Sequence, residues 1–140
     1  MTIEEIQQEI IDDFSGFDDW MDKYQMLIDL GGEQEPLDEK YKTEDNLIDG
    51  CQSRVWLHAE YIDGKVVFSA ESDALIVKGL VALLIRVLSE QTPDDILDAD
   101  LHFIPDIGMS EHLSPTRSNG LLAMIKQMRI YAMAFKATNK

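Results

Sequence analysis

The chain has 140 residues, 45% of them hydrophobic, which is enough for one domain, residues 1–140, that folds as a monomer around its own core. Its 27 acidic and 12 basic residues give a net charge of −15. This charge repels nucleic-acid phosphates and anionic lipids, so both are excluded as expected partners. No apolar run reaches the roughly 18 residues of a membrane span, and the first residues lack a secretion signal. Together with a single cysteine, these features predict a cytoplasmic protein.

The charge is unevenly distributed along the chain. Residues 1–49 contain 16 acidic residues and 3 lysines, a net charge of −13, whereas residues 110–140 contain 1 acidic and 5 basic residues, a net charge of +4. We interpret the acidic residues first as solubilising and only second as a docking face for a basic protein.

Two helices are predicted at the start of the chain. Thr2 and Glu5 form a capping-box pattern, and the apolar residues that follow repeat at helical spacing as far as Phe14. A second helix is expected to begin after the acidic pair Asp18-Asp19 and to end at Gly31-Gly32. Residues 32–45 then form a predicted loop.

A β-hairpin is predicted in the middle of the chain. Residues 55–61 and 65–70 alternate between apolar and polar side chains, and Asp63-Gly64 between them is typical of a tight turn. Residues 46–48 are expected to add a third strand, which would place Gly50 and Cys51 in the connection between two strands.

The remainder of the chain is predicted to be helical. Ser72-Asp73 is expected to cap a helix over 74–88 that is apolar around most of its circumference, and Thr92-Pro93 begins a short helix. An irregular segment, 101–117, precedes a final helix over 118–137. The expected fold class is therefore α+β, a small antiparallel sheet of about three strands with helices packed on it.

Cys51 is the residue on which the functional hypotheses depend. A lone thiol forms no internal disulfide and no multi-cysteine metal cluster, so it is either an inert buried residue or a reactive one. Gly50 allows a sharp bend that would present the sulfur on a loop. His58 is expected at the surface, His102 has no predicted partner, and His112 is a candidate to approach the thiol.

The residues around Cys51 resemble the signature of the SufE family, the sulfur-acceptor proteins of iron–sulfur cluster assembly. Further segments resemble that family's blocks in the same order, so that the resemblance covers nearly the whole chain. The matching residues are Asn46, Ile48, Gly50-Cys51-Gln52-Ser53 and Val55-Trp56, then Trp20, Lys23-Tyr24, Leu30-Gly31, Ser72-Asp73-Ala74, Ile76-Val77-Lys78-Gly79-Leu80, Thr92-Pro93 and His112 to Leu121.

This resemblance implies that Cys51 accepts sulfur as a persulfide from a pyridoxal-phosphate cysteine desulfurase (SufS-like), which the chain stimulates. The sulfur then passes to an iron–sulfur scaffold complex (SufBCD-like). The pyridoxal phosphate belongs to the desulfurase, so no cofactor or metal is expected in this chain. The fold implied is similar to that of the U-type iron–sulfur scaffold proteins.

The resemblance also implies roles for the other residues of the signature. Asn46, Gln52 and Ser53 would hold the loop by hydrogen bonds, and Trp56 would cover an apolar pocket that shelters the thiol. Asp73 is expected to cap the helix behind the loop. Arg117 and His112 are expected to contact the partner, Arg117 with loop tethering as its alternative role.

Two other functions remain open from the sequence. One is an autonomous thiol enzyme, such as a one-Cys peroxidase or an acyl-transferring hydrolase. The other is a non-catalytic adaptor in which Cys51 is passive.

Overall fold

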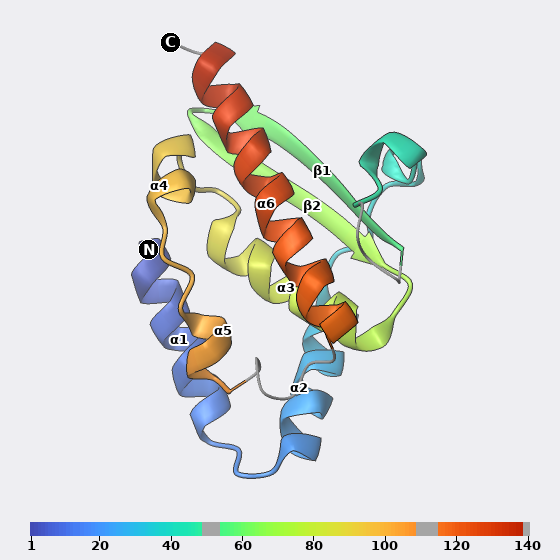
Figure 1. Cartoon of the computed structure of the whole chain (residues 1–140), viewed down its shortest axis with the longest axis vertical. Coiled ribbons are helices and arrows are strands. Elements are labelled where there is room, and N and C mark those ends of the chain that lie inside the picture. Colours follow the sequence, from blue (N-terminus) through green and yellow to red (C-terminus); the bar gives the residue numbers. More distant parts are fainter. Residues whose placement is uncertain (49–53, 109–114, 139–140) are drawn as a thin grey trace.

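The fold is α+β, with a β-hairpin and helices packed around one central helix, as predicted (Figure 1). The computed structural model describes residues 1–48, 54–108 and 115–138, with side chains from 118 onward in the last range. The elements are α1 (Ile3–Ser15), α2 (Trp20–Glu33), the 3₁₀ turns η1 (Glu39–Tyr41) and η2 (Glu44–Asn46), β1 (Val55–Ile62), β2 (Lys65–Ser72), α3 (Leu75–Leu88), α4 (Pro93–Asp98), α5 (Phe103–Asp106) and α6 (Pro115–Thr138).

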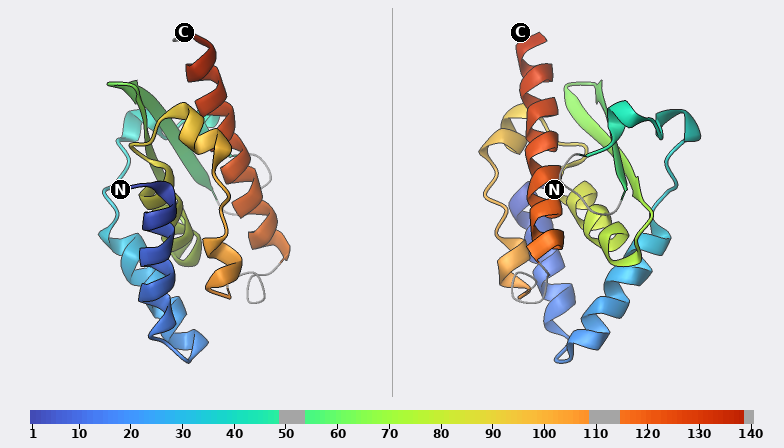
Figure 2. Two further views of the ribbon diagram at one scale, coloured as in Figure 1. Left: turned by 90° about the vertical axis from the view of Figure 1, so that its left-hand side faces the viewer. Right: turned by 45° about the vertical axis from the view of Figure 1, so that its right-hand side comes forward.

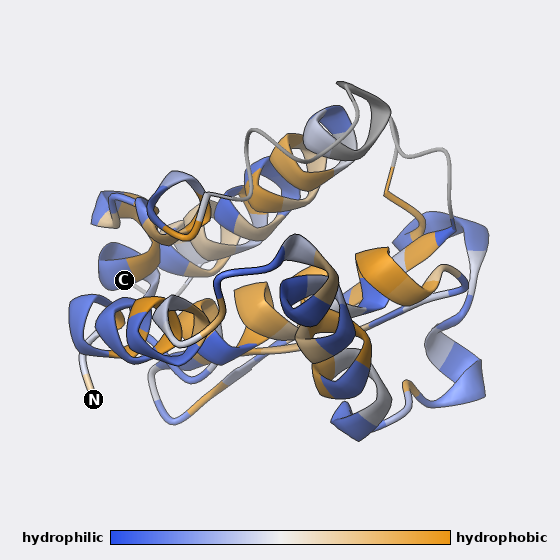
Figure 3. Ribbon diagram, turned by 90° about the horizontal axis from the view of Figure 1, so that it is seen from below, coloured by the Kyte–Doolittle hydropathy of each residue, from blue (hydrophilic) through white to orange (hydrophobic). Residues whose placement is uncertain are grey.

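Helix α3 is the centre of the molecule. It contacts β2, α1, α2 and α6. Half of its residues are buried, and in Figure 3 its ribbon is mostly hydrophobic behind α2. The prediction of a helix buried on more than one side is confirmed, and α3 is the support on which the hairpin lies.

Helix α1 begins with the predicted capping box. The Glu5 backbone N–H donates to Thr2 Oγ1 at 3.1 Å, and the Thr2 backbone N–H donates to Glu5 Oε1 at 3.0 Å. Each side chain therefore satisfies a backbone donor that the first turn of a helix leaves free. The buried side of α1 includes Ile10 and Phe14, which lie in the core.

Helices α2 and α3 cross with their backbones in contact. A Cβ atom added at Gly79 would lie 2.2 Å from the Leu27 carbonyl oxygen, and one added at Gly31 would lie 2.9 Å from the Gly79 nitrogen. Only glycine fits such a crossing. Helix α2 was predicted to end at Gly31-Gly32 but continues to Glu33, because here glycine serves helix packing instead of ending the helix.

The hairpin forms as predicted, with Val55 paired to Ser72 and Ile62 to Lys65. Asp63 and Gly64 both have positive φ, 53° and 82°, as a tight two-residue turn between twisted strands requires. The described residues form two strands, and the expected third strand is reduced to an isolated bridge between Leu47 and Trp56.

The two faces of the hairpin differ. Leu57, Val66 and Phe68 are buried on the face that joins the core, whereas Trp56 and His58 alternate with them on the outer face. The Tyr41 ring stacks on the His58 ring with 3.6 Å between their centroids, so η1 covers part of the outer face. His58, expected at the surface, is thus partly covered.

The C-terminal part contains one more helix than predicted. Residues 103–106 of the expected irregular segment form the short helix α5, and α6 begins at Pro115, three residues before the predicted start. Pro115 suits the first turn of a helix because its ring lacks an N–H there. The buried stripe of α6 contains Leu121, Met124, Ile125, Met128 and Ala132.

Candidate functional site

The residues on both sides of the Cys51 segment are fixed by backbone hydrogen bonds. Residues 49–53, and with them Gly50, Cys51, Gln52 and Ser53, lie outside the described residues. Before them, the Ile48 N–H donates to the Val55 carbonyl oxygen at 2.9 Å. After them, the Arg54 N–H donates to Asp73 Oδ1 at 3.1 Å, and the Asp73 N–H donates to the Arg54 carbonyl oxygen at 3.3 Å. The described frame of the site is therefore the start of β1 and the turn that leads from β2 into α3.

Asp73 is hydrogen-bonded to Arg54 at the start of β1 and does not cap α3. The N-cap position is Ala74, which has no side-chain cap, and Ser72 Oγ accepts from the Ala74 N–H at 3.3 Å. The expected capping role is wrong because the Asp73 carboxylate is used by the Arg54 backbone instead. A carboxylate that accepts a backbone N–H makes a stronger hydrogen bond than a neutral acceptor does.

Asn46 holds the chain that precedes residues 49–53 by a side-chain hydrogen bond. Its Nδ2 donates to the Tyr41 carbonyl oxygen at 2.7 Å and so ties η2 to η1. Because the Tyr41 ring stacks on His58, this bond holds the 3₁₀ turns against the outer face of β1.

Trp56 lies half-buried on the outer face of the hairpin, opposite Glu71. Glu71 forms an ion pair of 2.5 Å with Lys42 and accepts from the Leu37 N–H at 3.2 Å. The Lys42 hydrogen bond, aided by the Leu37 N–H, lowers the pKa of Glu71, and the same pair raises the pKa of Lys42. Glu71, the cross-strand neighbour of Trp56, thus fastens to β2 the chain on both sides of η1, through the Leu37 N–H before it and the Lys42 ion pair after it.

Residues 107–108, which precede the expected partner contacts His112 and Arg117 in the chain, are held by α2. Gly108 has a φ of 79°, and a Cβ atom there would lie 3.2 Å from the Trp20 ring. Lys23 Nζ lies 4.7 Å from the centre of that ring and 3.5 Å from the Ile107 carbonyl oxygen, to which it donates. Trp20 and Lys23, two α2 residues of the signature, therefore hold residues 107–108, which directly precede the undescribed residues 109–114.

The two expected partner contacts are only partly covered by the structure. His112 lies outside the described residues. The backbone of Arg117 belongs to the first turn of α6, and its side chain lies outside the description.

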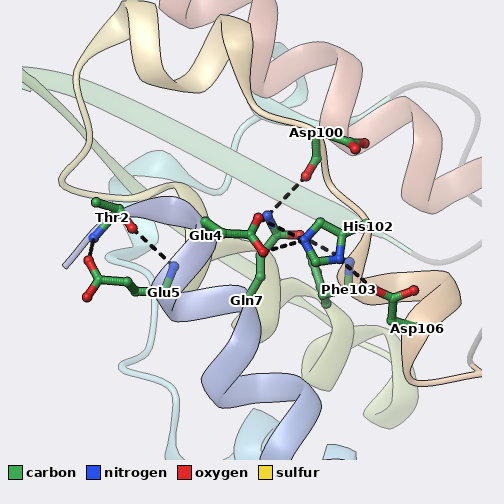
Figure 4. Close-up of polar contacts among 8 residues, drawn as sticks. All are labelled: Thr2, Glu4, Glu5, Gln7, Asp100, His102, Phe103 and Asp106. Carbon is green, nitrogen blue, oxygen red and sulfur yellow. Dashed lines mark hydrogen bonds and ion pairs between the residues drawn. The ribbon is translucent and has the colours of Figure 1, made fainter.

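A second polar cluster, which the sequence did not reveal, joins α1 to the chain between α4 and α5 (Figure 4). His102 Nδ1 lies 2.5 Å from Asp106 Oδ2, and His102 Nε2 lies 2.8 Å from Glu4 Oε2. The hydrogen bond to Asp106, and then that to Glu4, raises the pKa of His102. The spacing of His102 and Asp106 by four residues was a usable signal, but Glu4 is 98 residues away.

Gln7 is the buried centre of the same cluster. Its Oε1 accepts from the Phe103 N–H at 3.1 Å, and its Nε2 donates to the Asp100 carbonyl oxygen at 3.0 Å. A single amide side chain, 1% exposed, thus satisfies two backbone groups of the chain that leads into α5.

Within residues 1–48, 54–108 and 115–138, no three His, Cys, Asp or Glu side chains are grouped so that they would hold a metal ion. No helix of this part of the chain is long and apolar enough to cross a membrane.

One solved structure with the same fold is the solution structure of a hypothetical protein from Thermus thermophilus. The TM-score is 0.76 at 21% sequence identity, over 92% of this chain and 94% of that chain. At this identity the likeness shows the fold.

The sequence itself matches a family described as "SufE: Fe-S metabolism associated domain", over residues 8–132. This match includes Cys51 and every residue of the frame around it. The chain therefore belongs to the SufE family, whose domain is associated with iron–sulfur metabolism.

Proposed function

We propose that the chain is a sulfur carrier that works with a pyridoxal-phosphate cysteine desulfurase. Cys51 takes sulfur from the persulfide of the desulfurase, stimulates its turnover by doing so, and passes the sulfur to an iron–sulfur scaffold complex. The observation that carries the proposal is the family match, which spans the only cysteine of the chain.

The proposed transfer is an exchange at sulfur. The Cys51 thiolate attacks the terminal sulfur of the desulfurase persulfide, a new S–S bond forms on Cys51, and the desulfurase cysteine leaves as a thiolate. The sulfur oxidation states of the pair are exchanged and no external oxidant is needed. A protein with one cysteine suits this step, because a second thiol would attack the persulfide, form a disulfide and release sulfide.

The frame around Cys51 supports a role in presentation. The bonds of Ile48 and Arg54 attach the two residues that flank the segment to the hairpin and to the turn that leads into α3. We place the pyridoxal phosphate in the desulfurase and the reaction in a reducing cytoplasm, where a free thiol persists. We propose that the chain is a monomer until it meets its partner.

The test is a mass measurement on the intact chain. After incubation with a SufS-like desulfurase, cysteine and pyridoxal phosphate, the chain should gain about 32 Da, one sulfur atom, on Cys51. Alanine release by the desulfurase should rise in the same mixture. Cys51→Ser is the matched control and should show neither effect.

Other outcomes identify the other functions. An unchanged mass beside an active desulfurase would overturn the carrier function. Stimulation that Cys51→Ser retains in full would indicate an adaptor, and turnover of a peroxide or an ester without any partner would indicate an autonomous thiol enzyme.

A further inference from the structure

Helix α5 has four residues, too few for a helix that is stable by itself. Figure 2 (left) shows the chain that leads from α4 into α5 running alongside α1. Two kinds of contact hold it there. Phe103 and Ile107 are buried in the core, and polar bonds join this chain to α1 through Gln7 and His102 (Figure 4). A change in these bonds therefore changes how firmly α5 is held.

The imidazole of His102 lies between two carboxylates that belong to different elements. Its Nδ1 is 2.5 Å from Asp106 Oδ2, at the end of α5. Its Nε2 is 2.9 Å and 2.8 Å from the two carboxylate oxygens of Glu4, in the first turn of α1. An ionised carboxylate only accepts hydrogen bonds, so both ring nitrogens must donate at the same time. A neutral imidazole carries one N–H and the charged imidazolium carries two, so this geometry suits the charged form.

The positive charge in this contact is that of His102 itself. Within residues 1–48, 54–108 and 115–138, the charged side chains that face the imidazole are Asp106 and Glu4. Arg129 of α6 also reaches this stretch of chain, but it donates to the Ala99 carbonyl. The hydrogen bond to Asp106, followed by that to Glu4, raises the pKa of His102 from its ordinary value of 6.5. The charged form therefore persists to a higher pH in the folded chain.

Loss of the proton affects the two bonds of His102 unequally. Asp106 is four residues away in the same short stretch, whereas Glu4 is 98 residues away on another helix. Keeping the local bond orders less of the chain. The remaining N–H therefore stays on Nδ1, and Nε2 becomes an acceptor that faces the Glu4 carboxylate. Because both are then acceptors, this contact becomes repulsive.

We propose that His102 is a proton-operated latch between α1 and α5. When the imidazole is charged, it bridges Glu4 and Asp106 and the latch is closed. When the proton on Nε2 leaves to solvent, the bond to Glu4 breaks and the bond to Asp106 remains. The start of α5 is then attached to α1 by Gln7 and by the burial of Phe103. Glu4 is free to move away, because its side chain is 66% exposed.

The latch makes one contact of the fold respond to the acidity around the protein. It is closed below about pH 6.5 and opens as the pH rises through the folded pKa of His102. The device is separate from the proposed sulfur chemistry, because none of its three side chains belongs to the frame around Cys51.

Nuclear magnetic resonance of the ring nitrogens in the full chain tests the protonation step. The ¹⁵N shifts of His102, followed from about pH 5 to pH 9, should show two protonated nitrogens at low pH. At high pH they should show a protonated Nδ1 and a bare Nε2. A proton that stays on Nε2 would overturn the order of release, and a pKa at or below 6.5 would overturn the charged bridge.

Amide hydrogen exchange of the same chain tests the opening. The N–H groups of Asp106, Ile107 and Gly108 donate to carbonyl oxygens of the preceding turn at 2.9 to 3.1 Å. After correction for the intrinsic pH dependence of exchange, their protection should fall about fivefold as the pH rises through the His102 pKa. The protection of the buried amides of α3 should stay constant over the same range.

A matched pair of variants assigns the effect to the latch. Glu4→Gln keeps the side-chain length but removes the charge, so it should lower the His102 pKa and reduce the pH-dependent change in α5 exchange. Glu9→Gln is the control, because Glu9 also lies on α1 but pairs with Arg86. It should leave both measurements unchanged.

Three further results would overturn the latch. They are a His102 pKa that Glu4→Gln does not lower, α5 protection that stays constant through that pKa, and equal effects of the Glu4 and Glu9 variants. Persulfide transfer is measured on Cys51, so a failure of the sulfur-carrier function would leave these measurements as they are.

Discussion

Two contacts hold parts of this chain together by opposite means. Where α2 crosses α3, the backbones touch because Gly79 and Gly31 have no side chains. Where α1 meets the chain between α4 and α5, the contact depends on the polar side chains of Gln7 and His102.

The difference shows what each contact can respond to. A backbone crossing contains no titratable group, so it is insensitive to pH and tolerates no added atom. The polar contact tolerates changes of side-chain shape better. It is lost, however, when a hydrogen-bond partner such as Gln7 is removed, and its strength varies with the protonation of His102. We therefore expect the glycine contact to govern whether the domain folds, and the polar contact to govern how firmly α5 is held.

The largest expected effect is that of Gly79→Ala. The added methyl group would collide with the Leu27 carbonyl, a backbone atom that cannot move without shifting α2, so the free energy of unfolding should fall by about 3 kcal/mol or more. Urea denaturation of the native and variant chains measures this loss.

Gly32→Ala is the matched control for this change. It follows Gly31 in α2 but is exposed, with no atom within 4 Å of the added methyl group, so alanine should raise the stability, by up to about 1 kcal/mol. Equal effects of the two substitutions would contradict the close crossing.

An intermediate effect is expected for Gln7→Met. The new side chain has a similar length, but it leaves the Phe103 N–H and the Asp100 carbonyl of the buried contact without their partner, which costs about 2–4 kcal/mol. Hydrogen exchange should show faster exchange at Phe103. Gln8→Met, next along α1 and exposed, should change the stability by less than about 0.5 kcal/mol; a similar loss in both variants would place the effect in α1 itself.

The smallest effect is the pH dependence that His102 adds. The pKa of His102 is raised in the folded chain from 6.5 by Asp106 and Glu4, so its stabilising contribution is complete below about pH 6.5 and is lost as the pH rises through the folded pKa. The melting temperatures of native and His102→Asn chains should therefore differ most at low pH and converge at high pH. A difference that stays constant from about pH 5 to pH 9 would mean that the imidazole is not charged in this contact.

The local elements of the fold were predictable because their signals lie within a few residues. The capping box of Thr2 and Glu5, the turn at Asp63-Gly64 and the all-round apolar character of α3 each depend on neighbours in sequence. The third strand was overestimated because residues 46–48 offer only a single bridge to Trp56.

Long-range pairings were not predictable in the same way. Asp73 has the residue type and position of a helix cap, and only the fold brings the Arg54 N–H to its carboxylate. Likewise nothing near His102 in sequence indicates Glu4 as its partner. In the candidate site, Cys51 was identified by its solitude and by the family signature, whereas the frame around it required the structure.

The bonds at Ile48 and Arg54 also give the protein two internal reporters. Both are backbone N–H groups in defined hydrogen bonds, one on each side of residues 49–53. Their amide resonances respond when the chain between them is displaced, and neither requires labelling or substitution of the thiol. Binding of the proposed desulfurase at Cys51 can therefore be tested spectroscopically, with the native cysteine in place.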